Sequence, residues 1–598
     1  MKYNDKAFYA AVTFYMQKLK GKVENKLVFA IANIEDENAF FSIAPLSMAV
    51  HELGGDIHVT IKEKEEFVNY KILKRAWYTY EDHLKGLKTE KTNALLAFIN
   101  AVDKRTKTKV FRDMFKKPEI ILKASNNGFT GTIELPYKNE WHSKYRFKDL
   151  LKTSNAIWKQ GYSLKSKEKV GISFVLTPKK QDIELPIEDY LDSYSIALAM
   201  AIAAKKFGAR VYLSAATDRP SRLAKAVRSA DLMATLKGCE LEKDIDEEVF
   251  KKFKKLSNIL KMNKMSFVSA NFGIHAKGYF GKHFFGDMIG YPTPNKKSRW
   301  SSPGEMMLKD RYSPQAKDEP RPPLMRHAIT ETLPIDIFIE TCNVDYPKLR
   351  KRSEKVRDIL NKCKYVRVIG KEMKAYGKSH KTDFRFDLLT KDKVRRKFTS
   401  HDSEVNTLID MEFYKETGIK AGNYANFPSG EAFVCPENLK GQIIGDVVIN
   451  VGQSRMIPKD TPLILHCNGE EYTILKAPSK LNEIIKKELK EARQKINDLN
   501  KSESTPKSMI KMFKDNFKKI GEFAINTNPK AKVCNYLIVN EKISGMIHVA
   551  MGSGFEPDRK TVYHWDIVID SPKQKLDIYG VDEKGQLHWV HKKGKLVV

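Results

Sequence analysis

Apolar and polar residues alternate along the chain with two periods, which predict both helices and strands. Helix-like spacing of apolar residues occurs at positions 7–16, 345–360 and 480–499. Short apolar runs separated by glycine and proline turns fill residues 382–475, and residues 520–598 are equally rich in strand-like runs. We therefore expect the second half of the chain to combine helices with several short strands.

The first half contains a weak internal repeat. Residues 34–44 align without gaps with residues 187–197, and each copy continues as a helix-like apolar stretch to a glycine, Gly55 or Gly208. Candidate strands precede and follow each copy, at residues 26–31, 56–59, 171–176 and 209–213. This order predicts two units of a parallel α/β sheet, whether the copies share an origin or are alike by chance.

Five side chains suited to metal binding lie in short apolar segments of the second half, where charge is costly unless it is paired or bound to a cation. They are Glu431, Glu522, His548, His564 and Asp566. His564 and Asp566 are separated by one residue, so in a strand both point to one face and offer a nitrogen and an oxygen ligand. A hydrogen-bonded histidine–aspartate pair in a core would give the same pattern.

The other three residues also have ordinary interpretations when taken singly. His548 alone would be interpreted as a core histidine, and an arginine or backbone amides could partner Glu431 and Glu522. Together, however, the five supply carboxylates to bridge or cap and imidazoles to anchor two ions. Two divalent ions about 3.5–4 Å apart bind a scissile carbonyl and lower the pKa of a bridging water. The set therefore indicates a dinuclear hydrolase site.

The segments that contain these residues resemble the aminopeptidase T (thermophilic leucyl aminopeptidase) family of metallopeptidases. The similar segments, in the family's order and rough spacing, are residues 381–386, 426–433, 521–524, 545–552 and 564–566. The resemblance extends over about residues 344–569 and is looser over residues 195–213. About the first 150 residues match no part of the family that we recognise.

This resemblance implies a cytoplasmic, homodimeric exopeptidase that removes N-terminal residues from peptide substrates with two metal ions. The ligands that it carries over are Glu431, Glu522, His548, His564 and Asp566. It also implies Glu431 and Glu522 as catalytic carboxylates and zinc, cobalt or manganese as the ions. Which carboxylate bridges the two ions is left open.

Two positions depart from the family pattern. Phe555 stands where the family has a tyrosine thought to stabilise the tetrahedral intermediate, and Lys381 replaces a glycine. Losing one such donor costs on the order of 100- to 1,000-fold in turnover. Strand alternation turns Tyr563 away from the ligands, whereas Arg559 or Lys560 could supply a donor instead. A single-iron, ring-cleaving dioxygenase-like relative and a metal-stabilised scaffold without catalysis are the alternatives.

The expected fold class is an α/β N-terminal region with parallel-sheet units, followed by an α+β metal-binding catalytic domain. We divide the chain into four regions. Residues 1–160 form an unrecognised α/β region, and residues 161–290 form an α/β domain similar to the family's N-terminal unit. Residues 291–330 form a linker or long loop, and residues 331–598 form the catalytic domain. The linker is expected because its segment is rich in proline, serine, lysine and arginine.

The composition of the chain argues against some classes of protein. The six cysteines stand singly without CxxC pairs, which argues against a disulfide framework or a thiolate zinc site and suits a reducing cytoplasm. No apolar run approaches the roughly 18 to 20 residues of a membrane span, so no membrane partner is expected.

The net charge of +32 is compatible with nucleic-acid binding. The lysines, however, are scattered among glutamates, as in residues 486–491, which favours solvated helix faces. We therefore do not expect a nucleic-acid partner. A nucleic-acid-binding protein is the alternative from another class, and its binding would fall steeply with salt.

Overall fold

The computed structural model describes most of the chain in segments. They are residues 2–33, 36–62, 119–162, 164, 166, 169–177, 187–217, 267–273, 325–331, 333–391, 393, 395–400, 424–501, 507–554 and 558–598. Phe555 and residues 291–324 of the expected linker lie outside the described residues.

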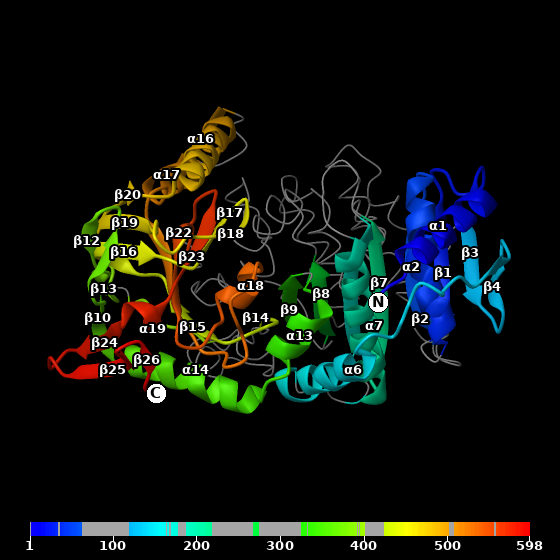
Figure 1. Cartoon of the computed structure of the whole chain (residues 1–598), viewed down its shortest axis with the longest axis horizontal. Helices are drawn as coiled ribbons and strands as arrows, with labels where there is room; N and C mark the ends of the chain where they lie inside the picture. The colour runs from blue at the N-terminus through cyan, green and yellow to red at the C-terminus, as the bar shows by residue number, and fades with distance from the viewer. Residues whose placement is uncertain are drawn as a thin grey trace, which may run out of the picture.

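The N-terminal sheet has the strand order β2-β1-β3-β4-β5. Its strands are β1 (Leu27–Asn33), β2 (Asp56–Lys62), β3 (Ile120–Ala124), β4 (Gly128–Gly131) and β5 (Leu135–Pro136). β1 pairs in parallel with both β2 and β3, and the remaining pairs are antiparallel. Helices α1 (Asp5–Leu19) and α2 (Glu37–Glu52) pack against each other beside this sheet (Figure 1).

The second sheet is parallel throughout, in the order β14-β9-β8-β6-β7. Its strands are β6 (Lys169–Thr177), β7 (Arg210–Thr217), β8 (Phe267–Gly273), β9 (Met325–Glu331) and β14 (Tyr424–Asn426). Helix α7 (Ile187–Lys206) connects β6 to β7 as α2 connects β1 to β2. The two parallel strand–helix–strand units predicted from the repeat are therefore present.

The expected linker needs one correction. β9 begins at Met325, so the last residues of the segment 291–330 form a strand inside a sheet. The proline-rich composition that predicted a linker ends just before this strand. The parallel sheet thus takes strands from both sides of residues 291–324.

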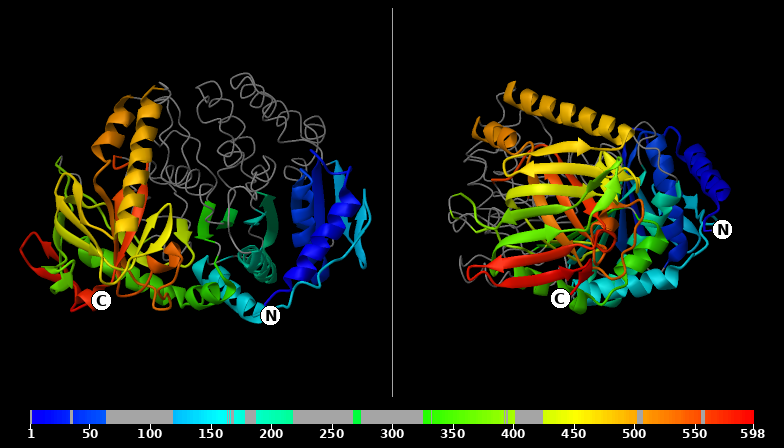
Figure 2. Two further views of the ribbon diagram at one scale, coloured as in Figure 1. Left: turned by 45° about the horizontal axis from the view of Figure 1, so that its top comes forward. Right: turned by 60° about the vertical axis from the view of Figure 1, so that its left-hand side comes forward.

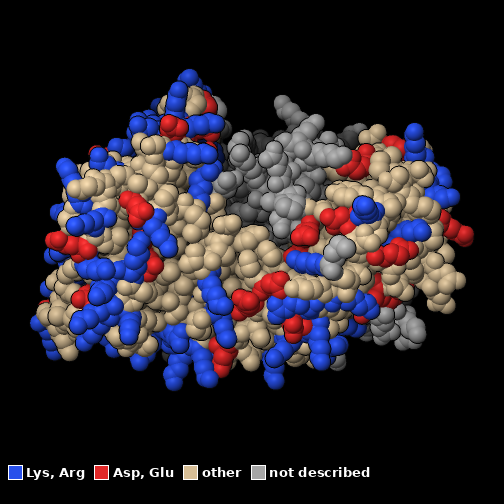
Figure 3. All heavy atoms as spheres, viewed as in Figure 1, with Lys and Arg blue, Asp and Glu red and all other residues tan. Residues whose placement is uncertain are grey.

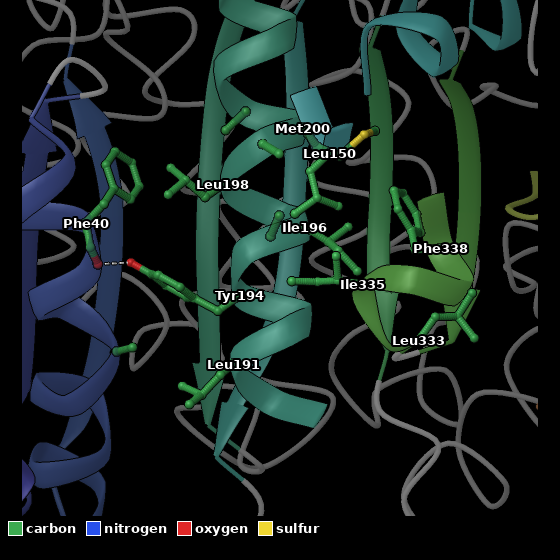
Figure 4. Close-up of a cluster of buried hydrophobic side chains, with 14 of the residues drawn as sticks. Phe40, Leu150, Leu191, Tyr194, Ile196, Leu198, Met200, Leu333, Ile335 and Phe338 are labelled. Atoms are coloured by element: carbon green, nitrogen blue, oxygen red, sulfur yellow. Dashed lines mark hydrogen bonds between the residues drawn. The ribbon is translucent and has the colours of Figure 1, made fainter. Parts of the chain in front are cut away.

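Helix α7 is buried over residues 191–201 because side chains pack on it from several elements. Figure 4 shows Tyr194 reaching toward α2, where its hydroxyl donates to the backbone carbonyl of Phe40. Ile196 lies on another side of the helix, near Leu150 of α6 (Phe147–Ala156) and Ile335 of α13 (Ile335–Cys342). This packing joins the two α/β units in one hydrophobic core.

The second half is built on two antiparallel sheets. The larger has the order β20-β19-β16-β13-β10-β24-β25-β26, and the smaller β15-β21-β22-β23-β17-β18. The strands of the larger sheet are β10 (Cys363–Ile369), β13 (Asp383–Asp387), β16 (Glu437–Gly445), β19 (Leu463–Asn468), β20 (Tyr472–Lys476), β24 (Asp577–Asp582), β25 (Leu587–Lys592) and β26 (Lys595–Leu596). Those of the smaller are β15 (Glu431–Val434), β17 (Val448–Val451), β18 (Gln453–Met456), β21 (Ile520–Asn526), β22 (Ile547–Gly552) and β23 (His564–Ile569). Figure 2 shows the larger sheet with its strands side by side.

The two sheets share one hydrophobic core. Phe523 of β21 packs on Phe386 and Phe384 of β13, with ring centroids 4.8 and 6.1 Å apart. The other helices of this half are α14 (Tyr346–Leu360), α16 (Ser479–Lys501), α17 (Lys507–Asp515), α18 (Leu537–Asn540) and α19 (Ser571–Gln574), and β11 (Met373–Ala375) and β12 (Lys378–His380) form a separate hairpin. The helices expected at residues 345–360 and 480–499 are α14 and α16.

Charges of both signs are interspersed on the surface (Figure 3), as the scattering of lysines among glutamates in the sequence predicts. In Figure 3, Lys and Arg side chains are spread over both halves of the visible face, with Asp and Glu between them.

Among the helices that the structure describes, none is both long and apolar enough to cross a membrane.

Candidate metal centre

The smaller antiparallel sheet brings the five predicted ligands to one face. Directly opposed residues of antiparallel strands point to the same side of a sheet, as do residues two apart along one strand. Glu522 of β21 and Asp566 of β23 both lie opposite Ala550 of β22. His548 lies two residues before Ala550, and His564 lies two residues before Asp566 on its own strand. The register therefore places these four side chains together.

Glu431 joins the same face from the edge strand. It begins β15 and lies opposite Asn526, which is four residues after Glu522 on β21. Small residues occupy the positions between the ligands, since Ala524 lies opposite His548 and Gly552 lies opposite His564. These small side chains leave room above the sheet for the longer ligand side chains.

The ligand atoms form two groups that share Glu522. In the first, the Nε2 atom of His548 lies 3.2 Å from Oε1 of Glu522 and 3.6 Å from Oε2 of Glu431. In the second, the Nε2 atom of His564 lies 3.1 Å from Oδ1 of Asp566 and 3.7 Å from Oε2 of Glu522. Each oxygen of Glu522 thus faces a different histidine.

Backbone and amide oxygens orient both imidazoles. Nδ1 of His548 lies 2.9 Å from Oδ1 of Asn526, and Nδ1 of His564 lies 2.6 Å from the carbonyl oxygen of Ser553. Both oxygens only accept hydrogen bonds, so each Nδ1 carries the proton and donates it. Each Nε2 is then directed at the carboxylates, in the arrangement that metal-binding histidines use.

Electrostatics couple His564 to Asp566. Burial disfavours the charged form of His564, but the carboxylates of Asp566 and Glu522 outweigh it and raise the pKa of the imidazole to about 10. Burial likewise opposes charge on Asp566, yet the contact with His564 keeps its pKa below the ordinary value. In the absence of metal, these two residues therefore form an ion pair.

Two further charged residues of the centre are missing from the sequence prediction. Glu541 offers an oxygen to a third group, with His548 and Asp566, in which all three ligand atoms lie within 4.8 Å of one another. Burial raises the pKa of Glu541 to about 8. The charges of Asp566 and Glu431 add to this effect, and the charge of Lys542 opposes it. Lys542 places its ammonium nitrogen 2.6 Å from Oε1 of Glu431 and 3.2 Å from Oε1 of Glu541.

A signal for these two residues does exist in the sequence. Glu541 and Lys542 follow the apolar run Leu537-Ile-Val and are followed by Ile543, so two adjacent charges stand in an apolar segment. They lie in the turn after α18, where neither helical nor strand periodicity assigns a face.

The structure shows where Tyr563, Arg559 and Lys560 lie, the three residues that were compared as substitutes for the tyrosine of the aminopeptidase T family. The Tyr563 hydroxyl lies 2.7 Å from that of Tyr472 and donates to the carbonyl of Phe517, so it points away from the ligands as predicted. The expectation for Arg559 is wrong. Its guanidinium donates to the carbonyls of Pro436 and Ile520 at 2.9 and 3.1 Å, and so supports the backbone instead. Lys560 is buried, and its expected role stays a prediction.

The donor set fits divalent cations. The carboxylates of Glu431, Glu522 and Asp566 lie together with the carboxyl group of Glu541, whose pKa is raised, and with two cationic side chains, Lys542 and His564. The surplus of negative charge is mostly shielded from water, which is costly unless cations bind. Imidazole nitrogens and carboxylate oxygens are the ligands that zinc, cobalt and manganese accept.

Comparisons with known proteins give distant similarities only. No protein-family model matches the chain, and no curated protein matches it by sequence. The structure is similar to wild-type AmpT from Thermus thermophilus, with a TM-score of 0.42 and 12% identity over 76% of this chain and 100% of that one. It is also similar to 2,5-dihydroxypyridine dioxygenase from Pseudomonas putida KT2440, with a TM-score of 0.40 and 12% identity over 76% of this chain and 98% of that one.

Proposed function

We propose that the protein is a metal-dependent aminopeptidase that removes N-terminal residues from peptides with two divalent metal ions. One observation carries the proposal: five ligands from four neighbouring strands converge in two groups around Glu522. A single carboxylate that faces both histidines suits a pair of ions better than one isolated ion. When bound, such a pair polarises the scissile carbonyl and lowers the pKa of a water.

The predicted ligands form two positions, each suited to one metal ion. Glu431 and His548 would hold the first ion, and His564 and Asp566 would hold the second. Glu522 would serve both positions, because its two oxygens face the two histidines. Asn526 and the carbonyl of Ser553 orient the two imidazoles toward these positions. Zinc, cobalt or manganese suits this mixture of nitrogen and oxygen ligands.

The assignment to peptides rests on sequence. The segments around all five ligands resemble those of the aminopeptidase T family, in the same order and at similar spacing. A hydrolase of this kind acts on peptides whose N-terminal amine is free.

Metal content and peptide hydrolysis test the proposal together. The protein is loaded with zinc, cobalt or manganese, desalted, and analysed by elemental mass spectrometry, and it is then assayed on short peptides with free or acetylated N-termini. We expect close to two ions per chain, release of N-terminal residues from free peptides only, and loss of release after chelation. Glu522→Gln should abolish the activity, whereas Glu491→Gln, which changes an exposed carboxylate outside the ligand groups, should retain it.

Other outcomes favour the alternatives. Two ions without turnover on any peptide would indicate a metal-stabilised scaffold. One bound iron would indicate a ring-cleaving dioxygenase-like protein, although a two-histidine, one-carboxylate iron site needs both histidines around one ion. Among the described residues, none of the three ligand groups contains both His548 and His564. Undiminished activity of Glu522→Gln would refute the ligand assignment itself.

A further inference from the structure

A lysine ammonium group is built into the centre. Lys542 has only 1% of its surface exposed, and its nitrogen lies between Glu431 and Glu541. A buried ammonium group is costly unless carboxylates compensate its charge. Lys542 therefore belongs to the same electrostatic unit as the ligands, although it cannot bind a cation itself.

The backbone fixes Lys542 relative to Glu431. The N–H of Asn528 donates to the carbonyl of Lys542 at 2.9 Å, and the side-chain amide of Asn528 donates to the carbonyl of Ser429 at 3.0 Å. The N–H of Thr527 donates to the carbonyl of Gly430 at 2.7 Å, directly before Glu431. One short segment at the end of β21 thus holds both the turn that contains Lys542 and the turn that leads to Glu431.

The two oxygens of Glu431 have different neighbours. Oε1 lies 2.6 Å from the ammonium nitrogen of Lys542, whereas Oε2 lies 3.6 Å from Nε2 of His548. A carboxylate held in this way presents one oxygen to the ligand group and cannot rotate without losing a charge-assisted hydrogen bond. Glu541 also contacts the ammonium group, at 3.2 Å, and is the more exposed of the two carboxylates.

We propose that Lys542 is a positioning residue of the metal centre, which fixes Glu431 as a one-oxygen ligand beside His548 and retains Glu541 outside the set of ligands. The inference rests on the proposed two-metal function and extends it to a residue that contacts no ion. Lysine suits this role because its ammonium group is a compact charge with three donors, which can serve two carboxylates at once.

Cobalt binding to the full-length protein tests this role. Metal-free protein is titrated with cobalt alone, and the two dissociation constants are measured by calorimetry and by competition with a chelator. In Lys542→Met, we expect one of the two sites to weaken by about 10- to 100-fold, as is usual when a residue that orients a metal ligand is removed. The other site should weaken less, because Lys542 pairs with Glu431 and Glu541, whereas Asp566 pairs with His564 and interacts with Lys542 through its charge.

The matched control is Lys573→Met. Lys573 also holds a buried carboxylate, Asp446, at 3.1 Å, but neither residue belongs to the ligand groups. This variant also removes a lysine partner from a buried carboxylate, although Lys573 is 35% exposed, and it should bind both cobalt ions as the wild type does. Glu541→Gln should likewise retain two ions, since Glu541 is not a ligand in this proposal.

Several results would overturn the proposal. Unchanged or tighter cobalt binding in Lys542→Met would show that the ammonium group does not position a ligand, and loss of an ion in Glu541→Gln would make Glu541 a ligand. If Lys542→Met does not fold, the double variant Glu541→Gln/Lys542→Met removes the ammonium group together with one of its two carboxyl partners and is judged by the same criterion. Failure of the wild type to bind cobalt would refute the proposed function, whereas normal binding by the wild type and by Lys542→Met would refute only the role of Lys542.

Discussion

Nδ1 of His548 lies 2.9 Å from Oδ1 of Asn526, and both side chains are buried on neighbouring strands of the smaller sheet. The amide oxygen accepts the Nδ1 proton and so leaves the lone pair of Nε2 for the ligand group. Asn526 also lies opposite Glu431 in the register of β15 and β21. One amide therefore orients a histidine at the point where the edge strand contributes its carboxylate.

Replacing Asn526 should weaken metal binding without unfolding the protein. Asn526→Leu keeps a similar volume but removes the acceptor, so the imidazole loses its fixed orientation. We expect metal affinity at the His548 position to fall by about 10- to 100-fold, as measured by chelator competition. Asn361→Leu is the control, because the side-chain amide of Asn361 bonds to the backbone of Phe398 and lies outside the ligand groups. Equal affinities in the two variants would contradict the role of Asn526.

Single substitutions of the carboxylates should differ in how many ions they remove. Glu522 faces both histidines, whereas Glu431 and Asp566 each belong to one of the two groups around it. We expect Glu522→Gln to lose both ions and Glu431→Gln or Asp566→Asn to lose one. Elemental analysis after desalting gives the count directly. Retention of one ion by Glu522→Gln would show that the two positions fill independently.

Arg396 should contribute to stability through a partly buried ion-pair network. Its guanidinium donates to Glu437 at 2.8 Å and to Asp558 at 2.6 and 2.9 Å, and only 7% of the side chain is exposed. Arg396→Met leaves Glu437 largely buried without this partner, so the free energy of unfolding should fall by roughly 1–3 kcal/mol. Arg385→Met removes an exposed pair with Asp387 and should cost at most about 1 kcal/mol. Urea unfolding of both variants tests the difference.

His591 should make stability depend on pH. The side chain is fully buried in β25, and burial lowers the pKa of its imidazole to about 4. The unfolded chain, with a histidine pKa of about 6.5, binds a proton between these values that the folded chain does not. The free energy of unfolding is therefore highest above pH about 6.5 and should fall by about 2 kcal/mol from pH 7 to 5 on account of this residue.

Two histidine variants test whether this pH dependence of stability comes from His591. Within the described part of the chain, neither ring nitrogen of His591 has a hydrogen-bond partner. His591→Leu should therefore reduce the loss of stability between pH 7 and 5 and cost little at neutral pH. His466→Leu, at an exposed position, should retain the wild-type pH dependence. Identical profiles for the two variants would contradict a buried neutral His591.

Several features of the fold could be predicted from the sequence because they depend on short-range patterns. The two parallel strand–helix–strand units follow from apolar runs that end at Gly55 and Gly208. The shared face of His564 and Asp566 follows from the alternation of side chains in a strand. Helix α14 begins one residue after Asp345, whose side chain accepts from the N–H of Lys348 as a helix cap.

Local sequence patterns specify which strands carry the predicted ligands, because alternation and apolar context are local properties. The other residues of the centre are brought to it by tertiary contacts. Asn526 orients His548 through the pairing of β21 with β22, and Lys542 reaches Glu431 from a turn 111 positions away along the chain. Arg559, five positions before His564 in the sequence, instead donates to the carbonyls of Pro436 and Ile520. Strand register and turn packing depend on contacts between distant segments, and no local pattern specifies them.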